Sequence, residues 1–110
     1  MAFLIYSTWP DSKTAQKAVE QLLREKLIAC ANISQPITSM YRWKGKICKE
    51  SEVQVWLKTG AKNTDELQAA FLRLHPSEVP AFLVINIDEQ LSHQPFMSWL
   101  QAETDRENND

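Results

Sequence analysis

Residues 30–59 have the sequence CANISQPITSMYRWKGKICKESEVQVWLKT and predict two long strands joined by one tight turn. In the second strand Val53, Val55 and Leu57 alternate with more polar residues, as in a strand with one buried face. Gly45 supplies the turn between two lysines. Pro36 lacks a backbone N–H, so the first strand should be bulged or lie at a sheet edge there. The segment is therefore typical of an extended β-hairpin.

A strand and an amphipathic helix are predicted before this hairpin. Residues 3–8 form a short apolar and aromatic run, which Pro10 ends. Apolar residues then recur at helical spacing as far as Leu27, and Asp11 or Ser12 is expected to cap the helix.

A helix and a strand are also predicted after the hairpin. Asn63 has the properties of an N-cap, and the helix should end around Arg73, His75 and Pro76. Residues 82–87 predict a strand that is apolar on both faces, and a last short helix should hold Phe96, Trp99 and Leu100.

The predicted order is strand, helix, strand, strand, helix, strand, plus a C-terminal helix. This order indicates the α+β, ferredoxin-like (split βαβ, β-α-β-β-α-β) arrangement, in which both main helices cover one face of the sheet. The chain of 110 residues fits one domain at 1–103, followed by a polar, flexible tail at 104–110. Burial of one apolar side chain stabilises a fold by about 1.5–3 kcal/mol, so the strand at 82–87 should not stay exposed on its second face. We therefore predict self-association through the uncovered face or the strand edges.

Composition and missing motifs exclude several classes of function. Gly45 and Gly60 are the only glycines, so neither a P-loop nor a dinucleotide-binding motif is present, and we expect no catalytic activity. No apolar segment approaches the roughly 20 residues that span a bilayer, and the N-terminus resembles a strand more than a signal peptide. We therefore expect a cytoplasmic protein without membrane association.

The hairpin tip combines basic and aromatic residues, a feature that nucleic-acid-binding proteins also show. The net charge of −2 gives no overall attraction for polyanions, and the aromatic strand pattern of RNA-recognition motifs is absent. Basic residues at a strand tip also discourage edge aggregation. We therefore predict no nucleic-acid partner.

Two polar residues on one face of the second hairpin strand are candidate ligand-binding residues. Glu52 and Lys58 project to the same side, with Trp56 between them. On a lone sheet they would form a solvated face. In an oligomer they would instead line a polar pocket between subunits and fix an ionic ligand there.

The candidate metal ligands are Cys30, Cys48, His75 and His93, and none has a ligand-type neighbour within four positions. We expect Cys30 to be a small buried hydrophobic residue and His93 to be exposed. His75 ends a helix beside a proline. It is either a cation that satisfies free helix carbonyls or a metal ligand.

Several segments together resemble the CutA family of divalent-cation tolerance proteins, over about residues 3–101. They are Ser7-Thr8 with Pro10-Asp11, Leu27 to Ile33, Ser39 to Ile47, Glu52 with Leu57-Lys58-Thr59, His75 to Pro80, and Ser98-Trp99-Leu100. The resemblance implies a ferredoxin-like protomer in a tight homotrimer, tolerance of copper and other divalent metals, and clefts between subunits similar to those of PII signalling proteins. It implies no catalysis.

The sequence departs from the family pattern at the positions expected to bind copper. Ser7 stands where some relatives have a cysteine, and Leu74 stands where a second histidine is found, so His75 alone carries over as a metal ligand. Ser77 and Ala81 likewise replace an aromatic residue and a carboxylate of the presumed cleft. We therefore expect weak or indirect binding of a divalent metal such as copper.

The expected ligand-binding residues are Lys58, Glu52 and Trp43, with Cys30 as a further position of interest. The alternative function is a PII-like signalling or metabolite-binding trimer, whose intersubunit cleft takes a small anionic metabolite near Lys58.

Overall fold

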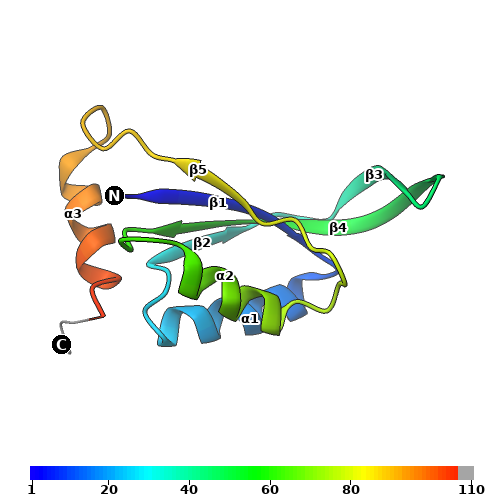
Figure 1. Ribbon diagram of the computed structural model, residues 1–110, viewed down its shortest axis with the longest axis horizontal. Coiled ribbons are helices and arrows are strands. Elements are labelled where there is room, and N and C mark those ends of the chain that lie inside the picture. The colour runs from blue at the N-terminus through cyan, green and yellow to red at the C-terminus, as the bar shows by residue number, and fades with distance from the viewer. Residues whose placement is uncertain (107–110) are drawn as a thin grey trace.

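Figure 1 shows the computed structural model of the protein, which describes residues 1–106. Its elements follow in the order β1 (Phe3–Trp9), α1 (Ser12–Arg24), β2 (Cys30–Ile33), β3 (Ile37–Trp43), β4 (Lys46–Thr59), α2 (Asp65–Leu74), β5 (Leu83–Asn86) and α3 (Gln94–Glu103). The antiparallel sheet has the order β2-β4-β1-β5, and β3 pairs with the remaining part of β4. This topology confirms the ferredoxin-like prediction.

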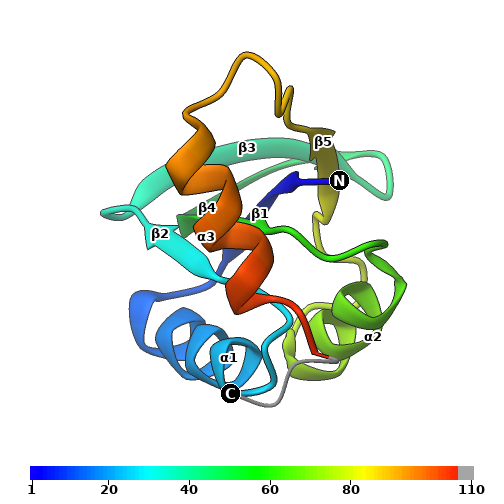
Figure 2. The same ribbon diagram turned by 90° about the vertical axis from the view of Figure 1, so that its left-hand side faces the viewer.

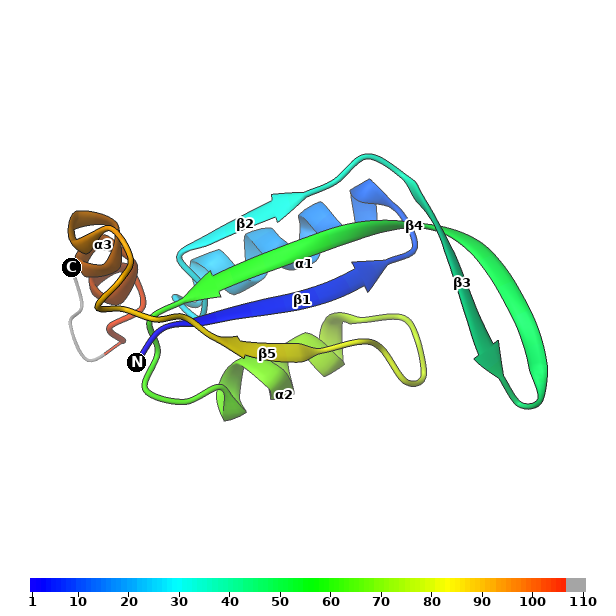
Figure 3. The same ribbon diagram turned by 90° about the horizontal axis from the view of Figure 1, so that it is seen from above.

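The two main helices lie side by side against one face of the sheet, as Figure 2 shows. The other face carries no helix in Figure 3. The core lies between helices and sheet, and its largest fully buried side chains include Trp9, Phe71, Ile5, Leu22 and Leu57. The buried face is therefore the one that the alternation of β4 predicted.

The long hairpin projects beyond the helices in Figure 1. Pro36 interrupts its first strand as expected, so that β2 and β3 pair with different parts of β4. At the tip, Lys44 and Gly45 have φ angles of 50° and 78°. Two successive positive φ angles are typical of the type I′ turn, whose twist matches that of paired strands.

Helix α1 ends three residues earlier than the apolar spacing predicted. Lys26 adopts a φ of 59°, and the backbone N–H of Leu27 donates to the carbonyl of Leu22, which closes the helix. Leu27 is nevertheless buried, because the returning chain packs it against the core. Its burial explains why it continued the helical pattern.

The cap of α2 also differs from the prediction. Thr64, not Asn63, occupies the N-cap position, and its side chain makes no capping bond. The side chain of Asn63 instead accepts a hydrogen bond from the backbone of Asp65 at 3.1 Å. Asn63 thus satisfies a backbone donor from one position further out.

Strand β5 is the exposed edge of the sheet. Leu83, Val84 and Ile85 are 57%, 44% and 43% exposed, although successive residues point to opposite faces. The exposure on the helix-free face was predicted from the sequence, whereas the exposure of Val84 on the helix side was not.

Helix α3 packs across the end of the sheet through Met97 and Leu100. Thr104, predicted as the first residue of a flexible tail, is buried. Its hydroxyl donates to the carbonyl of Leu100 and accepts from the backbone N–H of Gly60. Thr104 is therefore part of the packed domain, whereas the prediction for residues 107–110 lies outside the described residues.

Candidate functional site

A groove of about 590 Å³ lies between the projecting hairpin and the segment that follows α2. Two chain segments form its walls. One contributes Ser39, Met40, Tyr41, Trp43, Cys48, Glu50 and Glu52, and the other His75, Ser77, Glu78, Val79, Pro80 and Ala81, with Thr8 alongside. Three of the four residues that we predicted for a site, Glu52, Trp43 and His75, therefore border one groove.

The strand register explains which hairpin residues line the groove. Tyr41 lies opposite Cys48, and Ser39 lies opposite Glu50, and residues directly opposite each other share a face. The phenol of Tyr41 donates to the Glu50 carboxylate at 2.5 Å. This hydrogen bond raises the pKa of Tyr41 to about 12, because the carboxylate stabilises the protonated phenol.

His75 borders the groove and is held there by two hydrogen bonds and by ring contacts. Its Nδ1 accepts from the backbone N–H of Ser77 at 3.0 Å, and a backbone N–H can only donate. The proton therefore resides on Nε2, which donates to the carbonyl of Thr8 at 2.8 Å. The buried ring also lies 4.2 Å from the Trp9 ring and 5.4 Å from the Phe71 ring, measured between centroids.

This geometry decides what the His75 ring does in the described conformation. Both ring nitrogens are engaged, so neither presents a lone pair to a metal ion. The ring also bonds to β1 and not to the carbonyls at the end of α2. His75 thus ties the loop that begins at Ser77 to strand β1, and metal binding would require this loop to move.

Ser7, which stands where a cysteine was expected from the family resemblance, lies in the same buried region as His75. Its hydroxyl donates to the carbonyl of Val55 at 2.9 Å and accepts from the indole N–H of Trp9 at 3.1 Å. The serine therefore connects two strands and orients the ring that packs on His75.

Lys58 lies away from the groove, near the other end of β4. It lies six positions after Glu52, a distance of about 20 Å along a strand. Its ammonium lies 5.8 Å from the ring centre of Phe96 on α3. Within one protomer Glu52 and Lys58 therefore do not share a pocket, and a shared intersubunit pocket stays a prediction.

The cysteines do not form a metal site either. Cys30 is half-buried opposite Lys58 rather than fully buried, and Cys48 is half-buried in the groove. His93 is exposed at the start of α3, as expected. Among residues 1–106, no three His, Cys, Asp or Glu side chains lie close enough together to hold a metal ion.

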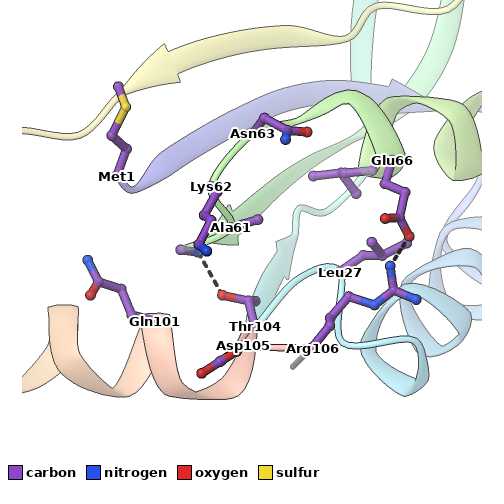
Figure 4. A pocket seen from close by; sticks show the side chains of 12 residues that line it. Met1, Leu27, Ala61, Lys62, Asn63, Glu66, Gln101, Thr104, Asp105 and Arg106 are labelled. Atoms are coloured by element: carbon purple, nitrogen blue, oxygen red, sulfur yellow. Dashed lines mark hydrogen bonds and ion pairs between the residues drawn. The ribbon is translucent and has the colours of Figure 1, made fainter. Parts of the chain in front are cut away.

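A second pocket, of about 530 Å³, lies between α3 and the segment that precedes α2 (Figure 4). Many of its polar groups already have partners. Arg106 forms an ion pair with Glu66, and Thr104 bonds to Gly60. This pairing makes the pocket a structural junction, so the groove is the stronger candidate site.

Sequence reasoning missed Tyr41, Glu50 and Cys48 as groove residues. The two-residue alternation of the hairpin places them on the face of Glu52, and this signal was available. It does not indicate which segment lies opposite that face.

No helix within the described part of the chain has the length and apolar character to cross a membrane.

Comparisons with known proteins agree with the fold. The sequence model of the CutA1 divalent ion tolerance protein family matches residues 3–103. The divalent-cation tolerance protein CutA of Pyrococcus horikoshii is 40% identical over 101 residues, which cover 92% of this chain and 96% of that protein.

Two solved structures extend the comparison. CutA from Archaeoglobus fulgidus, described as a periplasmic divalent cation tolerance protein, has a TM-score of 0.89 at 30% identity and covers 96% of this chain and 100% of its own. The PII-like protein CutA from Nostoc sp. PCC 7120 has a TM-score of 0.85 at 29% identity, with coverage of 93% and 96%. Since one neighbour is described as periplasmic, the cytoplasmic location of this chain stays a prediction.

Proposed function

The chain belongs to the CutA1 divalent ion tolerance protein family, and from this premise we propose that it supports tolerance of divalent metals, copper included, as a homotrimer with weak or indirect metal binding. This is a family of divalent-cation tolerance proteins, not a known family of enzymes. We further propose that the chain acts by binding and assembly, without catalysis of its own.

The observation that carries the assembly is the apolar strand β5. Leu83 and Ile85 project toward the helix-free face, and Val84 projects the opposite way. Each is at least 43% exposed in the single chain. Association with further copies would bury these side chains, each worth about 1.5–3 kcal/mol when fully buried. Light scattering at micromolar concentration tests this assembly. We expect the mass of three chains, and a monomer would contradict it.

Weak or indirect metal binding follows from the state of His75. A copper ion would have to displace the N–H of Ser77 from Nδ1 or the proton from Nε2. We therefore expect titration calorimetry with copper to give a weak isotherm that His75→Asn leaves nearly unchanged. Cys48→Ser, which removes the thiol from the groove, serves as the matched variant in the same copper titration. A tight isotherm that His75→Asn abolishes would show direct ligation instead.

A second candidate function is PII-like binding of a small anion near Lys58. Within residues 1–106 the Lys58 ammonium contacts the Phe96 ring and has no carboxylate partner. A cation beside apolar side chains favours an anionic ligand. A thermal-shift screen with nucleotides and organic acids should find stabilisation that Lys58→Met removes. No shift with any compound would contradict this alternative.

A further inference from the structure

The tip of the long hairpin concentrates positive charge in a chain that is otherwise acidic. Residues 42–49 contain no Asp or Glu and hold four of the chain's 12 lysines and arginines, Arg42, Lys44, Lys46 and Lys49. All four are exposed, and the tip projects beyond the helices in Figure 1. Within residues 1–106, none of the four forms an ion pair with a carboxylate. The tip is therefore a local cationic surface, although the net charge of the chain is −2.

The strand register divides the hairpin into two unlike faces, because residues directly opposite each other share a face. The first, which we call the basic face, consists of the pairs Thr38 with Ser51, Met40 with Lys49, and Arg42 with Ile47. All six residues are exposed, and none is acidic. The carboxylates Glu50 and Glu52 belong to the other face, which also carries Tyr41 and Trp43. The basic face thus combines cations with apolar side chains and lacks negative charge.

Ile47 is the apolar centre of the basic face. It is 76% exposed and does not border the groove. Met40 on the same face is 67% exposed, although it also borders the groove. Arg42 lies directly opposite Ile47, and Lys49 follows two positions later on the same strand. An aliphatic side chain at a projecting tip, with cations on either side, points away from the core of its own domain toward another surface.

This composition suits the boundary of an anionic lipid bilayer. Peripheral membrane segments insert apolar side chains at the level of the headgroups, while lysine and arginine contact the lipid phosphates. Each lysine or arginine close to an anionic membrane strengthens binding by about fivefold. The basic face and the turn supply Arg42, Lys44 and Lys49 for such contacts, with Ile47 among them.

Single-stranded nucleic acid fits the same surface less well. Proteins that bind single strands stack the bases on aromatic side chains. The basic face has no aromatic ring, because Tyr41 and Trp43 project to the opposite face. On that face the phenol of Tyr41 is bonded to the Glu50 carboxylate, whose charge repels phosphates. The positive charge and the aromatic rings of the tip are thus largely separated.

We infer that the hairpin tip binds the surface of an anionic phospholipid bilayer, with Ile47 inserted at the headgroup boundary and Arg42, Lys44 and Lys49 against lipid phosphates. This contact goes beyond the proposed role in metal tolerance and does not depend on it. It revises the expectation of no membrane association, which rested on the absence of a spanning segment and of a signal peptide. A peripheral contact requires neither.

Sedimentation with lipid vesicles tests the inference on the full chain in its native assembly. We expect the protein to sediment with vesicles of phosphatidylglycerol and phosphatidylcholine, and not with vesicles of phosphatidylcholine alone. Binding should weaken as salt is added, because salt screens the charges. The double variant Lys44→Gln/Lys49→Gln should weaken binding by about 25-fold, since two cations are removed. Ile47→Ser should weaken it roughly fivefold, because insertion of an aliphatic side chain is lost.

Two matched variants separate this surface from general attraction. Lys13→Gln/Lys17→Gln removes the same charge from exposed positions of α1. Leu91→Ser removes an 87% exposed aliphatic side chain from the segment between β5 and α3, which lies at the opposite end from the hairpin tip in Figure 1. Both should bind the mixed vesicles like the wild type.

Three results would overturn the inference. One is the absence of sedimentation with the mixed vesicles at low salt. Another is an equal loss of binding in the tip variants and in their matched controls. The third is binding of polyuridylate without binding of vesicles, which would assign the basic tip to nucleic acid. The proposed metal-tolerance function fails separately, through a monomeric mass or a tight copper isotherm that His75→Asn abolishes, so the two failures are distinguishable.

Discussion

At the scale of single residues, hydrogen bonds and one ring contact connect the buried residues behind the groove in a series. Val55 accepts from Ser7, Ser7 accepts from Trp9, and the Trp9 ring packs on His75. His75 in turn accepts from Ser77 at the groove wall. Among the described residues, no buried side-chain nitrogen or oxygen lacks a partner. A serine at position 7 is thus integrated into the fold by its hydroxyl, a role that a thiol fulfils less well.

The pair of Tyr41 and Glu50 gives a prediction about pH. The fold raises the pKa of Tyr41 from 10.0 to about 12, first through the hydrogen bond to Glu50. Because the folded pKa lies above the unfolded value, the stabilisation by the neutral phenol is complete below about pH 10 and is lost as the pH rises through about 12. We expect the phenolate of Tyr41 to form near pH 12, as measured by the absorbance difference between wild type and Tyr41→Phe.

Two carboxylate variants test the cause of this shift. Glu50→Gln should lower the midpoint toward 10.0, whereas Glu52→Gln should lower it less, since Glu52 contributes only a minor electrostatic effect. An unchanged midpoint in Glu50→Gln would show that the hydrogen bond does not persist in solution.

At the scale of elements, the backbone of helix α3 lies very close to Gly60, which directly follows β4. A Cβ atom at Gly60 would lie 2.7 Å from the Cα of Gln101, which belongs to the helix backbone. The helix cannot give way like a flexible side chain. Gly60 also bonds to the Thr104 hydroxyl, which ties down the end of α3.

We therefore predict that Gly60→Ala lowers the free energy of unfolding by about 1–3 kcal/mol, the usual cost of overpacking. Denaturant unfolding measures this change. Gly45→Asn is the matched control, because the space around Gly45 is open and asparagine tolerates its φ of 78°. A loss of stability that is equal in both variants would contradict the role of the close approach.

The sequence predicts the type and order of the elements here, with β2 and β3 as one strand interrupted at Pro36, but not all of the boundaries. Alternation placed the buried face of β4 correctly because its residues meet one continuous core. The end of α1 was wrong because Leu27 keeps helical spacing while the backbone turns at Lys26. Thr104 was assigned to a tail because its partner Gly60, 44 residues earlier in the chain, becomes a neighbour only after folding.

The candidate site was predictable to a similar degree. The face of Glu52 and the position of His75 at a helix end follow from local pattern, and the groove contains both. Whether Glu52 and Lys58 line one pocket between subunits stays a prediction, because alternation assigns a face without saying what covers each part of a long strand. The position of residues 77–81 across the groove from the hairpin depends on the path of the chain, which no local pattern indicates.

At the scale of the whole molecule, the layers are asymmetric. Helices α1 and α2 cover one face of the sheet, and the hairpin projects away from them (Figures 1 and 3). Ile85 lies opposite Leu4 on the helix-free face, whereas Leu72 lies on the outer side of α2, and the two are 43% and 48% exposed. In a single chain these two side chains are equivalent in exposure. In the proposed trimer Ile85 should become buried, whereas Leu72 should stay exposed.

This difference provides a paired test of the assembly. In a monomer, Ile85→Lys and Leu72→Lys should each change the unfolding free energy by no more than about 0.5 kcal/mol, as surface substitutions usually do. In the trimer, Ile85→Lys would place an unpaired charge where apolar surfaces meet, which costs several kcal/mol, while Leu72→Lys stays in solvent. We expect light scattering to show dissociation of Ile85→Lys at concentrations where Leu72→Lys keeps the mass of three chains. If both variants keep that mass, the helix-free face near β5 is not the contact surface, because a buried lysine there could not be accommodated without loss of affinity.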